Sequence, residues 1–174
     1  MHTPNVSTYL RSRRIRRTQL SLILLFLCLG PILAVAEEPA AGKAPAFDAE
    51  LAKKLGADER GMKSYVLCIL KTGPRDAKVV GKEREEVFAG HFANIGRLAD
   101  EGKLAVAGPF GKNERSYRGL YIFNVPTVEE AETLVVLDPA VKAGVFVYEL
   151  TPWYASAALM VVPATHKRLE KPKP

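Results

Sequence analysis

Cysteine is scarce in this chain, whose 174 residues include only Cys28 and Cys68. Cys28 lies in a leader that we expect to be removed, so the mature chain would keep one thiol and form no internal disulfide. Packing alone must then hold the fold, although an oxidising compartment would permit a disulfide. Cys68 lies in an apolar stretch, where a thiol typically fills core space. A nucleophilic role would need a base nearby in sequence, and none is there.

Several motifs that carry chemistry are also missing. The sequence has no glycine-rich phosphate-binding loop, no serine elbow and no pair of catalytic carboxylates. His91, Asp138 and one cysteine make no metal-ligand set, and His166 adds none at a useful spacing. We therefore predict neither a metal site nor a bound cofactor.

The first 36 residues are predicted to be a secretory signal peptide. An arginine-rich region without acidic residues precedes an apolar core over 20–33, and Ala34–Ala36 gives a small-x-small cleavage site before Glu37. An uncleaved membrane anchor is the alternative. It is disfavoured because the apolar run is shorter than the roughly 18 to 20 residues of a spanning helix, and Pro31 interrupts it.

Removal of the leader removes most of the positive charge. The whole chain has 25 Lys and Arg against 19 Asp and Glu; the leader holds five arginines and no acid, which leaves 20 against 19. A near-neutral chain gives little support to a role on nucleic acid or on an anionic membrane surface. We also expect no stable membrane insertion once the signal segment is cleaved. We expect the mature protein in the periplasm or outside the cell. Ser12-Arg13-Arg14 leaves the twin-arginine route open beside the general one.

The rest of the chain divides into a linker over 37–63, a domain over 64–154 and a tail over 155–174. The linker begins with a spacer rich in Ala, Pro and Glu that is expected to be disordered. It then holds apolar residues at four-residue spacing before Gly56, which predicts a short helix packed on the domain: Phe47, Leu51 and Leu55. The tail is expected to add an edge strand or cover a partner, and to fray from Lys167.

The domain shows strand and helix patterns in a recognisable order. We predict a strand over 65–70, a helix from about 82 to 100, strands over 103–107 and 119–125, a helix over 128–137 and a strand over 145–150. A charged loop over 112–118 precedes the third strand. Thr127 and Glu130 have capping-box spacing, Gly102 follows the last turn of the first helix, and Asp138-Pro139 breaks the second. This order predicts an α+β, ferredoxin-like split βαβ fold (βαββαβ), with an antiparallel sheet and both helices on one face.

The first long helix carries a histidine on its apolar side. Its apolar positions recur at three- and four-residue steps: Val87, Phe88, His91, Ile95 and Leu98. The opposite side is expected to face solvent: Glu83, Arg84, Glu85, Asn94, Arg97, Asp100 and Glu101. His91 is therefore predicted to face the sheet.

Both faces of the predicted sheet are apolar, although helices would cover only one. In the first strand Tyr65, Leu67 and Ile69 alternate with other apolar residues, and the third strand repeats the pattern. An uncovered apolar face of this size is an association surface. We predict a two-fold homodimer in which the open sheet faces meet.

Several motifs then resemble the YCII-related (YciI-like) family over 64–154. They are Leu70-Lys71-Thr72-Gly73-Pro74, the helix from His91 through Arg97 to Leu104, Ala107-Gly108-Pro109-Phe110, Glu129-Glu130-Ala131, Asp138 to Gly144, and Pro152-Trp153-Tyr154. The helix from Phe47 and Gly56-Ala57-Asp58 resemble the secreted branch of this family. The resemblance implies a dimeric α+β barrel. It also implies a site in which a helix histidine and the aspartate of an Asp-Pro motif face a cleft, here His91 and Asp138.

The residues support two hypotheses from different classes. Histidine titrates near neutral pH, and a carboxylate on its second nitrogen fixes its tautomer, so His91 and Asp138 would transfer protons in an isomerase or lyase-like enzyme. Its substrate would be a small, aromatic or acidic molecule, as the fold likeness of the family to muconolactone isomerases and aromatic-ring dehalogenases implies. Alternatively, His91 is a core histidine, Asp138 caps a turn, and the protein is a non-catalytic small-ligand-binding or stress-related accessory dimer.

Other residues near this site are open to two interpretations. Gly108, Pro109 and Phe110 would bring backbone N–H groups and an aromatic wall to a ligand, or simply form a tight turn between strands. Three arginines are candidates for holding a carboxylate, and each is interpreted as a solvated surface charge: Arg75, Arg97 and Arg118. Neither the substrate nor the reaction follows from the sequence.

Overall fold

The computed structural model describes residues 46–171. The predicted signal peptide, the spacer up to residue 45 and the last three residues lie outside this part. Within it, no helix combines the length and apolar character that crossing a membrane requires.

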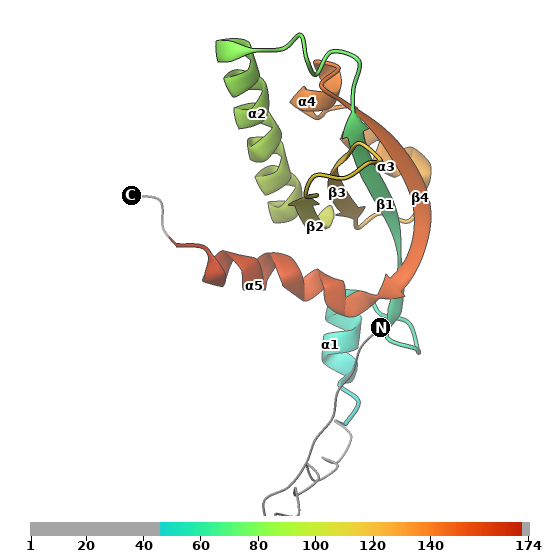
Figure 1. Ribbon diagram of the computed structural model, residues 1–174. Helices are drawn as coiled ribbons and strands as arrows, with labels where there is room; N and C mark the ends of the chain where they lie inside the picture. Colours follow the sequence, from blue (N-terminus) through green and yellow to red (C-terminus); the bar gives the residue numbers. More distant parts are fainter. Residues whose placement is uncertain (1–45, 172–174) are drawn as a thin grey trace, which may run out of the picture. The chain divides into compact units, whose positions relative to one another are not determined.

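The domain is built on one antiparallel sheet of four strands. The strands are β1 (Met62–Thr72), β2 (Leu104–Pro109), β3 (Tyr117–Phe123) and β4 (Phe146–Ser156), in the order β2-β3-β1-β4. Helix α2 (Gly81–Asp100) connects β1 to β2, whereas α3 (Val128–Val135) and α4 (Pro139–Lys142) connect β3 to β4. This is the predicted ferredoxin-like α+β arrangement (Figure 1).

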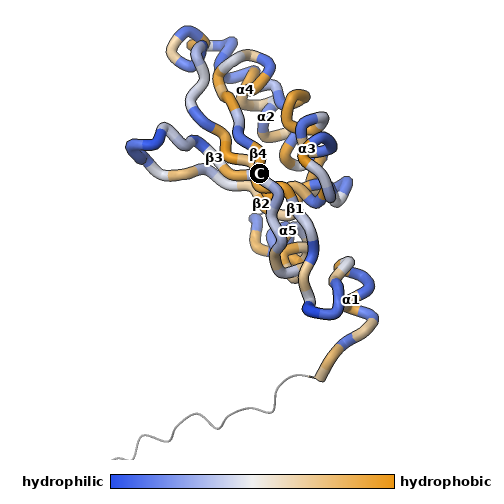
Figure 2. Tube along the Cα trace, turned by 90° about the vertical axis from the view of Figure 1, so that its right-hand side faces the viewer, coloured by the Kyte–Doolittle hydropathy of each residue, from blue (hydrophilic) through white to orange (hydrophobic). Residues whose placement is uncertain are grey.

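One face of the sheet packs on α2, α3 and α4. Alternate residues of β1 and β3 point into this core and are almost fully buried: Val66, Cys68, Leu70, Tyr121 and Phe123. The helices contribute Leu98 from α2 and Val135 from α3, which are also fully buried. Hydrophobic residues gather where the strands meet the helices (Figure 2). The principal core therefore lies on the helical face, as predicted.

The opposite face is covered in part by the C-terminal segment, which forms the 3-10 helix η1 (Ala157–Val161) and helix α5 (Val162–Leu169). Leu159 and Met160 pack against a second apolar cluster on this face: Tyr65, Ala105, Ile122 and Ala155. Of the two roles predicted for the tail, the edge strand is wrong, because the segment after β4 is helical, and the cover of a partner stays a prediction. Helix α5 extends past Lys167, where fraying was expected. The segment covers the sheet of its own chain.

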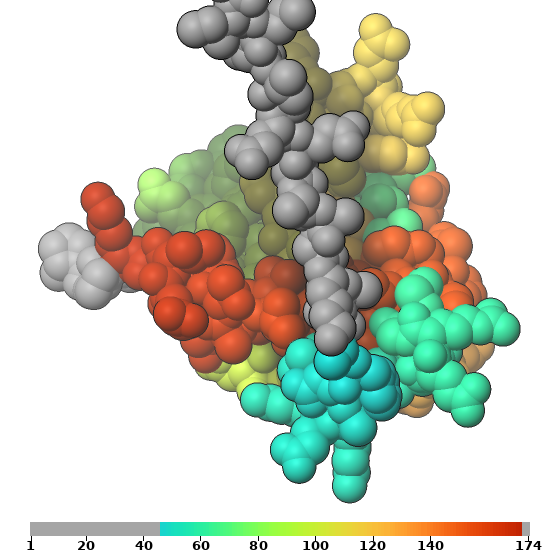
Figure 3. All heavy atoms as spheres, turned by 90° about the horizontal axis from the view of Figure 1, so that it is seen from below, coloured from blue at the N-terminus to red at the C-terminus, as the bar shows by residue number. Residues whose placement is uncertain are grey.

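A short helix, α1 (Ala49–Leu55), precedes the sheet. Asp48 caps it by accepting a hydrogen bond from the Leu51 N–H at 2.9 Å, and Gly56 ends it in the left-handed conformation at φ 71°. The apolar stripe expected to pack on the domain is mostly in solvent, since Phe47 is 80% and Leu51 46% exposed. The helix lies beside η1 on the surface (Figure 3).

Three of the four strands are longer than the apolar runs that predicted them, whereas β3 keeps the predicted length and begins two residues earlier. β4 pairs with β1 along its whole length, from Met62 opposite Ser156 to Thr72 opposite Phe146. β2 runs on to Pro109, so the predicted turn begins inside a strand. Helix α3 ends at Val135, two residues before the predicted end. Its Thr127 cap is as predicted and accepts from the Glu130 N–H at 3.2 Å.

Candidate active site

His91 lies at the middle of α2, on the side that faces the sheet, and is 6% exposed. One residue earlier, Gly90 lets another element come close: a Cβ at this position would lie 2.9 Å from Cγ of Pro139. Pro139 is the first residue of α4. The missing side chain of Gly90 therefore allows α4, and the aspartate that precedes it, to approach the histidine.

Asp138 is the N-cap of α4 and is fully buried. Its Oδ1 accepts a hydrogen bond from the Ala140 N–H at 2.8 Å, and Pro139 follows it at the first helical position. The local sequence Asp-Pro thus starts a helical turn and aims the carboxylate at α2.

The two side chains are in direct contact. His91 Nδ1 lies 2.9 Å from both Oδ1 and Oδ2 of Asp138. An ionised carboxylate only accepts hydrogen bonds, so Nδ1 carries the proton, and in the neutral ring the free lone pair is on Nε2. Among residues 46–171, Nε2 has no hydrogen-bond partner, and it is not sealed from solvent. The structure thus brings together the two residues that the resemblance paired.

Two further side chains donate to the same carboxylate. Tyr121 Oη, from β3, lies 2.9 Å from Oδ2 and 3.3 Å from His91 Nδ1, and Asn94 Nδ2 lies 3.4 Å from Oδ2. Burial raises the pKa of Asp138, but the hydrogen bonds from His91, Ala140 and Tyr121 and the charge of His91 outweigh it and hold the pKa below the ordinary value. Asp138 is therefore ionised at neutral pH.

The tyrosine is held in the opposite state. Burial, and then the adjacent Asp138 charge, raise the pKa of Tyr121 far above its ordinary value. Tyr121 is therefore a proton donor in a hydrogen bond, not a base. Its hydroxyl holds the Asp138 carboxylate in place, and this carboxylate in turn orients His91.

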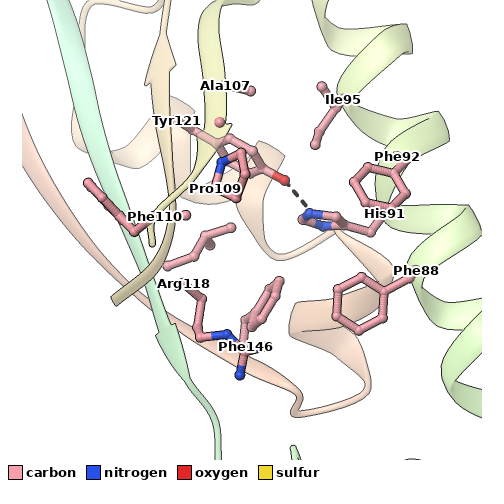
Figure 4. A pocket seen from close by; sticks show the side chains of 13 residues that line it. Phe88, His91, Phe92, Ile95, Ala107, Pro109, Phe110, Arg118, Tyr121 and Phe146 are labelled. Atoms are coloured by element: carbon pink, nitrogen blue, oxygen red, sulfur yellow. Dashed lines mark hydrogen bonds between the residues drawn. The ribbon is translucent and has the colours of Figure 1, made fainter. Parts of the chain in front are cut away.

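A pocket of about 440 Å³ opens beside His91. Side chains from α2 face side chains from β2 and β3 across it (Figure 4). Five of its thirteen lining residues are Phe or Tyr: Phe88, Phe92, Phe110, Tyr121 and Phe146. An apolar cavity of this size with a few polar groups suits a small molecule.

The three residues predicted to bind a ligand, Gly108, Pro109 and Phe110, all line this pocket. Their expected contribution of backbone N–H groups is not seen in two of them. Pro109 has no N–H, and the Phe110 N–H donates to the carbonyl of Arg118 at 3.0 Å. The segment offers the pocket an apolar wall instead.

Sequence reasoning missed three residues of the site. Asn94 was assigned to the solvent side but is 9% exposed, because α4 packs over this side of α2. Arg118 was interpreted as a solvated charge but lines the pocket. Tyr121 was seen only as a strand residue. Asn94 lies one helical turn from His91, which was the available signal.

The cysteine is no part of the chemistry. Burial, and then the Asp138 charge, raise the pKa of the Cys68 thiol to about 12, so it stays protonated at neutral pH. Across residues 46–171, no group of three or more His, Cys, Asp or Glu side chains is placed to hold a metal ion.

The fold and the site together define a class of protein: a ferredoxin-like α+β domain with a buried His–Asp pair beside an aromatic pocket. The chain belongs to the YCII-related domain family, whose model matches residues 64–154. Among solved structures it is similar to 5-chloro-2-hydroxyhydroquinone dehydrochlorinase from Burkholderia phenoliruptrix AC1100, in complex with 2,5-dihydroxybenzoquinone. The two are 25% identical over 51% of this chain and 92% of that one, with a TM-score of 0.39. No curated protein gives a significant match.

Proposed function

We propose that this protein is an exported enzyme that transfers a proton on a small molecule bound in the aromatic pocket. His91 is the general base or acid, and Asp138 is its positioning residue. The observation that supports this most is the contact of Nδ1 with both oxygens of a buried, ionised carboxylate, which leaves Nε2 available to the pocket.

The chemistry follows from this arrangement. Nε2 removes a proton from a carbon next to an electron-withdrawing group, and the imidazolium that forms is stabilised by Asp138. Return of the proton to another atom of the same molecule gives an isomerisation. When the electron pair of the broken C–H bond instead forms a double bond to the neighbouring carbon, and a leaving group departs from that carbon with the electron pair of its own bond, the result is an elimination.

Deuterium exchange tests the proposal without knowledge of the natural substrate. A panel of small enolisable ketones and keto acids is incubated with the protein in D2O, and loss of the C–H signal is followed by NMR. We expect exchange with the native protein and a loss of about 100-fold or more for His91→Gln, since a general base contributes about 10² to 10⁴. His166→Gln removes an exposed histidine on α5 and is the matched control.

Exchange that survives in His91→Gln would contradict the assignment of His91 as the base. If compounds bind but are recovered unchanged in every case, the protein is a non-catalytic ligand-binding module. The two hypotheses formed from the sequence are thereby separated.

We also propose that two copies pair through the open sheet face, and that the mature protein is periplasmic or extracellular. The dimer proposal is supported by apolar residues that η1 and α5 leave accessible on this face: Val147 is 42% and Trp153 39% exposed, and Leu67, Ile69 and Leu120 are half-buried. The export proposal is supported by the sequence of the leader alone.

A further inference from the structure

An arginine at the wall of the pocket indicates the charge of its ligand. We propose that the pocket binds a small monocarboxylate, or an organic anion of equivalent charge and shape, and that Arg118 is the residue that selects it. This inference rests on the proposed function of the same pocket.

Arg118 is the sole permanently charged residue among those that line the pocket, all of which lie within residues 46–171. It belongs to β3, and its side chain is 32% exposed. Its guanidinium carbon lies 5.4 Å from the centre of the Phe146 ring. The cation thus lies over an aromatic wall of the cavity, where it is partly withdrawn from solvent and attracts an anion more strongly than a surface charge would.

The charge of Arg118 is not cancelled by its protein partner. Asp76 accepts from Arg118 Nη1 at 2.8 Å and from Arg84 Nη2 at 2.9 Å, so two guanidinium groups share one carboxylate. Burial raises the pKa of Asp76, but the hydrogen bonds and charges of the two arginines lower it by more, so the pKa lies below its ordinary value and the carboxylate stays ionised. The cluster of these three residues therefore carries one positive charge in excess.

The two arginines differ in which of their N–H groups remain without a partner. Arg84 donates from Nη1 to the backbone carbonyls of Asp76 and Val79, and from Nη2 to the Asp76 carboxylate. Arg118 bonds only through Nη1, to Asp76 and, at 3.5 Å, to Thr72. Within residues 46–171 its Nε and Nη2 have no partner. These two N–H groups form the edge that binds a carboxylate in a bidentate manner.

The position of Phe146 relates the arginine to the base. Its ring centre is 5.4 Å from the His91 ring centre and 5.4 Å from the Arg118 guanidinium carbon. The imidazole and the guanidinium are therefore separated by no more than twice that distance. A small molecule whose anionic group lies on Arg118 has its next few carbon atoms within reach of His91, between the flat walls of Phe88 and Phe110.

Paired probes that differ only in charge test this inference. Benzoate and benzamide, phenylacetate and phenylacetamide, and crotonate and crotonamide are titrated into the native protein and followed by NMR. We expect at least one carboxylate to bind about tenfold or more tightly than its amide, in line with the strength of charged hydrogen bonds. The variants are Arg118→Met and Arg118→Lys. Arg75→Met is the matched control, because Arg75 pairs with an exposed Glu83 at 3.8 Å and does not line the pocket.

Arg118→Met is expected to bring the ratio of carboxylate to amide affinity close to one while amide binding stays unchanged. Arg118→Lys keeps part of the preference, and Arg75→Met keeps all of it. Thermal unfolding of each variant checks that the fold is retained. If Arg118→Met is unstable, the test is a reduced preference for carboxylate over amide in Arg118→Lys. Equal affinity for carboxylate and amide in the native protein, or a preference that survives in Arg118→Met, overturns the inference.

The outcome is distinguishable from that of the proposed function. Arg118-dependent binding of carboxylates without deuterium exchange upholds the anion site and refutes catalysis. Exchange that depends on His91 but is the same for neutral and anionic compounds, and unaffected by Arg118→Met, upholds catalysis and refutes the anion site.

Discussion

The hydroxyl of Tyr121 is the best single atom with which to probe the candidate site. Tyr121→Phe removes one oxygen from a residue that is 2% exposed and leaves the ring in place. It deletes the 2.9 Å hydrogen bond to Asp138 and the 3.3 Å contact with His91 Nδ1. No cavity larger than one oxygen atom forms, so the effect reports on the hydrogen bond itself.

The expected loss can be derived from the contacts of the carboxylate. A hydrogen bond to a charged group contributes about 1.5 to 3 kcal/mol to the free energy of unfolding. Asp138 keeps its bonds from His91, Asn94 and Ala140 in the variant, so we expect the lower end, about 1.5 to 2 kcal/mol.

The loss should depend on pH with a definite sign. Tyr121 is one of the groups that lower the folded-state pKa of Asp138 below its ordinary 3.8. Stability from a lowered carboxyl pKa is fully present above the ordinary value and is lost as the pH falls through the folded value. The difference between the native protein and Tyr121→Phe should therefore be largest at neutral pH and shrink below 3.8.

Urea unfolding followed by circular dichroism at about pH 7 and about pH 2 measures both quantities. Tyr148→Phe is the control, since its hydroxyl donates to exposed Glu132 at 3.0 Å and its loss should stay within about 0.5 kcal/mol. If the two variants lose the same free energy, or if the loss in Tyr121→Phe does not change with pH, the account of the Asp138 site is wrong.

Two further predictions concern packing and assembly. Gly90→Ala places a Cβ 2.9 Å from Pro139, whereas a Cβ at Gly96 in the same helix meets nothing within 4 Å. The free energy of unfolding in urea should therefore be lower for Gly90→Ala than for Gly96→Ala by about 1 to 3 kcal/mol. Equal stabilities would show that α4 can shift to accommodate the added methyl group. The one tryptophan, Trp153, is 39% exposed in the single chain, so dimerisation through the open sheet face predicts a red shift of its emission on dilution. Constant emission with a monomer mass by light scattering would refute that dimer.

The fold was largely predictable because each element carries its own signal. The helix caps at Thr127 and Gly102 and the apolar runs of β1 and β3 are local properties, and they are enough to give the order of elements. The extent of the strands is not local, because it depends on the partner strand. The last strand was predicted over 145–150, which ends before Pro152, yet β4 continues through this proline. As an edge strand, β4 tolerates a residue without an N–H.

The site was less predictable, because its parts come together only in three dimensions. His91 and Asp138 are 47 positions apart, and family resemblance rather than spacing paired them. Polarity assigned Asn94 and Arg118 to solvent, although α4 buries the first and the pocket includes the second. Single-sequence patterns report which side of an element is polar, but not what packs against that side.

Asp138 belongs at once to a helix start and to the candidate site. Its Oδ1 accepts from the Ala140 N–H and also from His91, so unwinding of the first turn of α4 removes one of the hydrogen bonds that hold the carboxylate beside the imidazole. Local opening of α4 and loosening of the pair are therefore coupled. Hydrogen exchange at the Ala140 amide therefore reports on the opening of the His91–Asp138 pair. A molecule that binds at His91 Nε2 and stabilises this pair should slow that exchange, although it lies on the opposite side of the imidazole ring from Asp138.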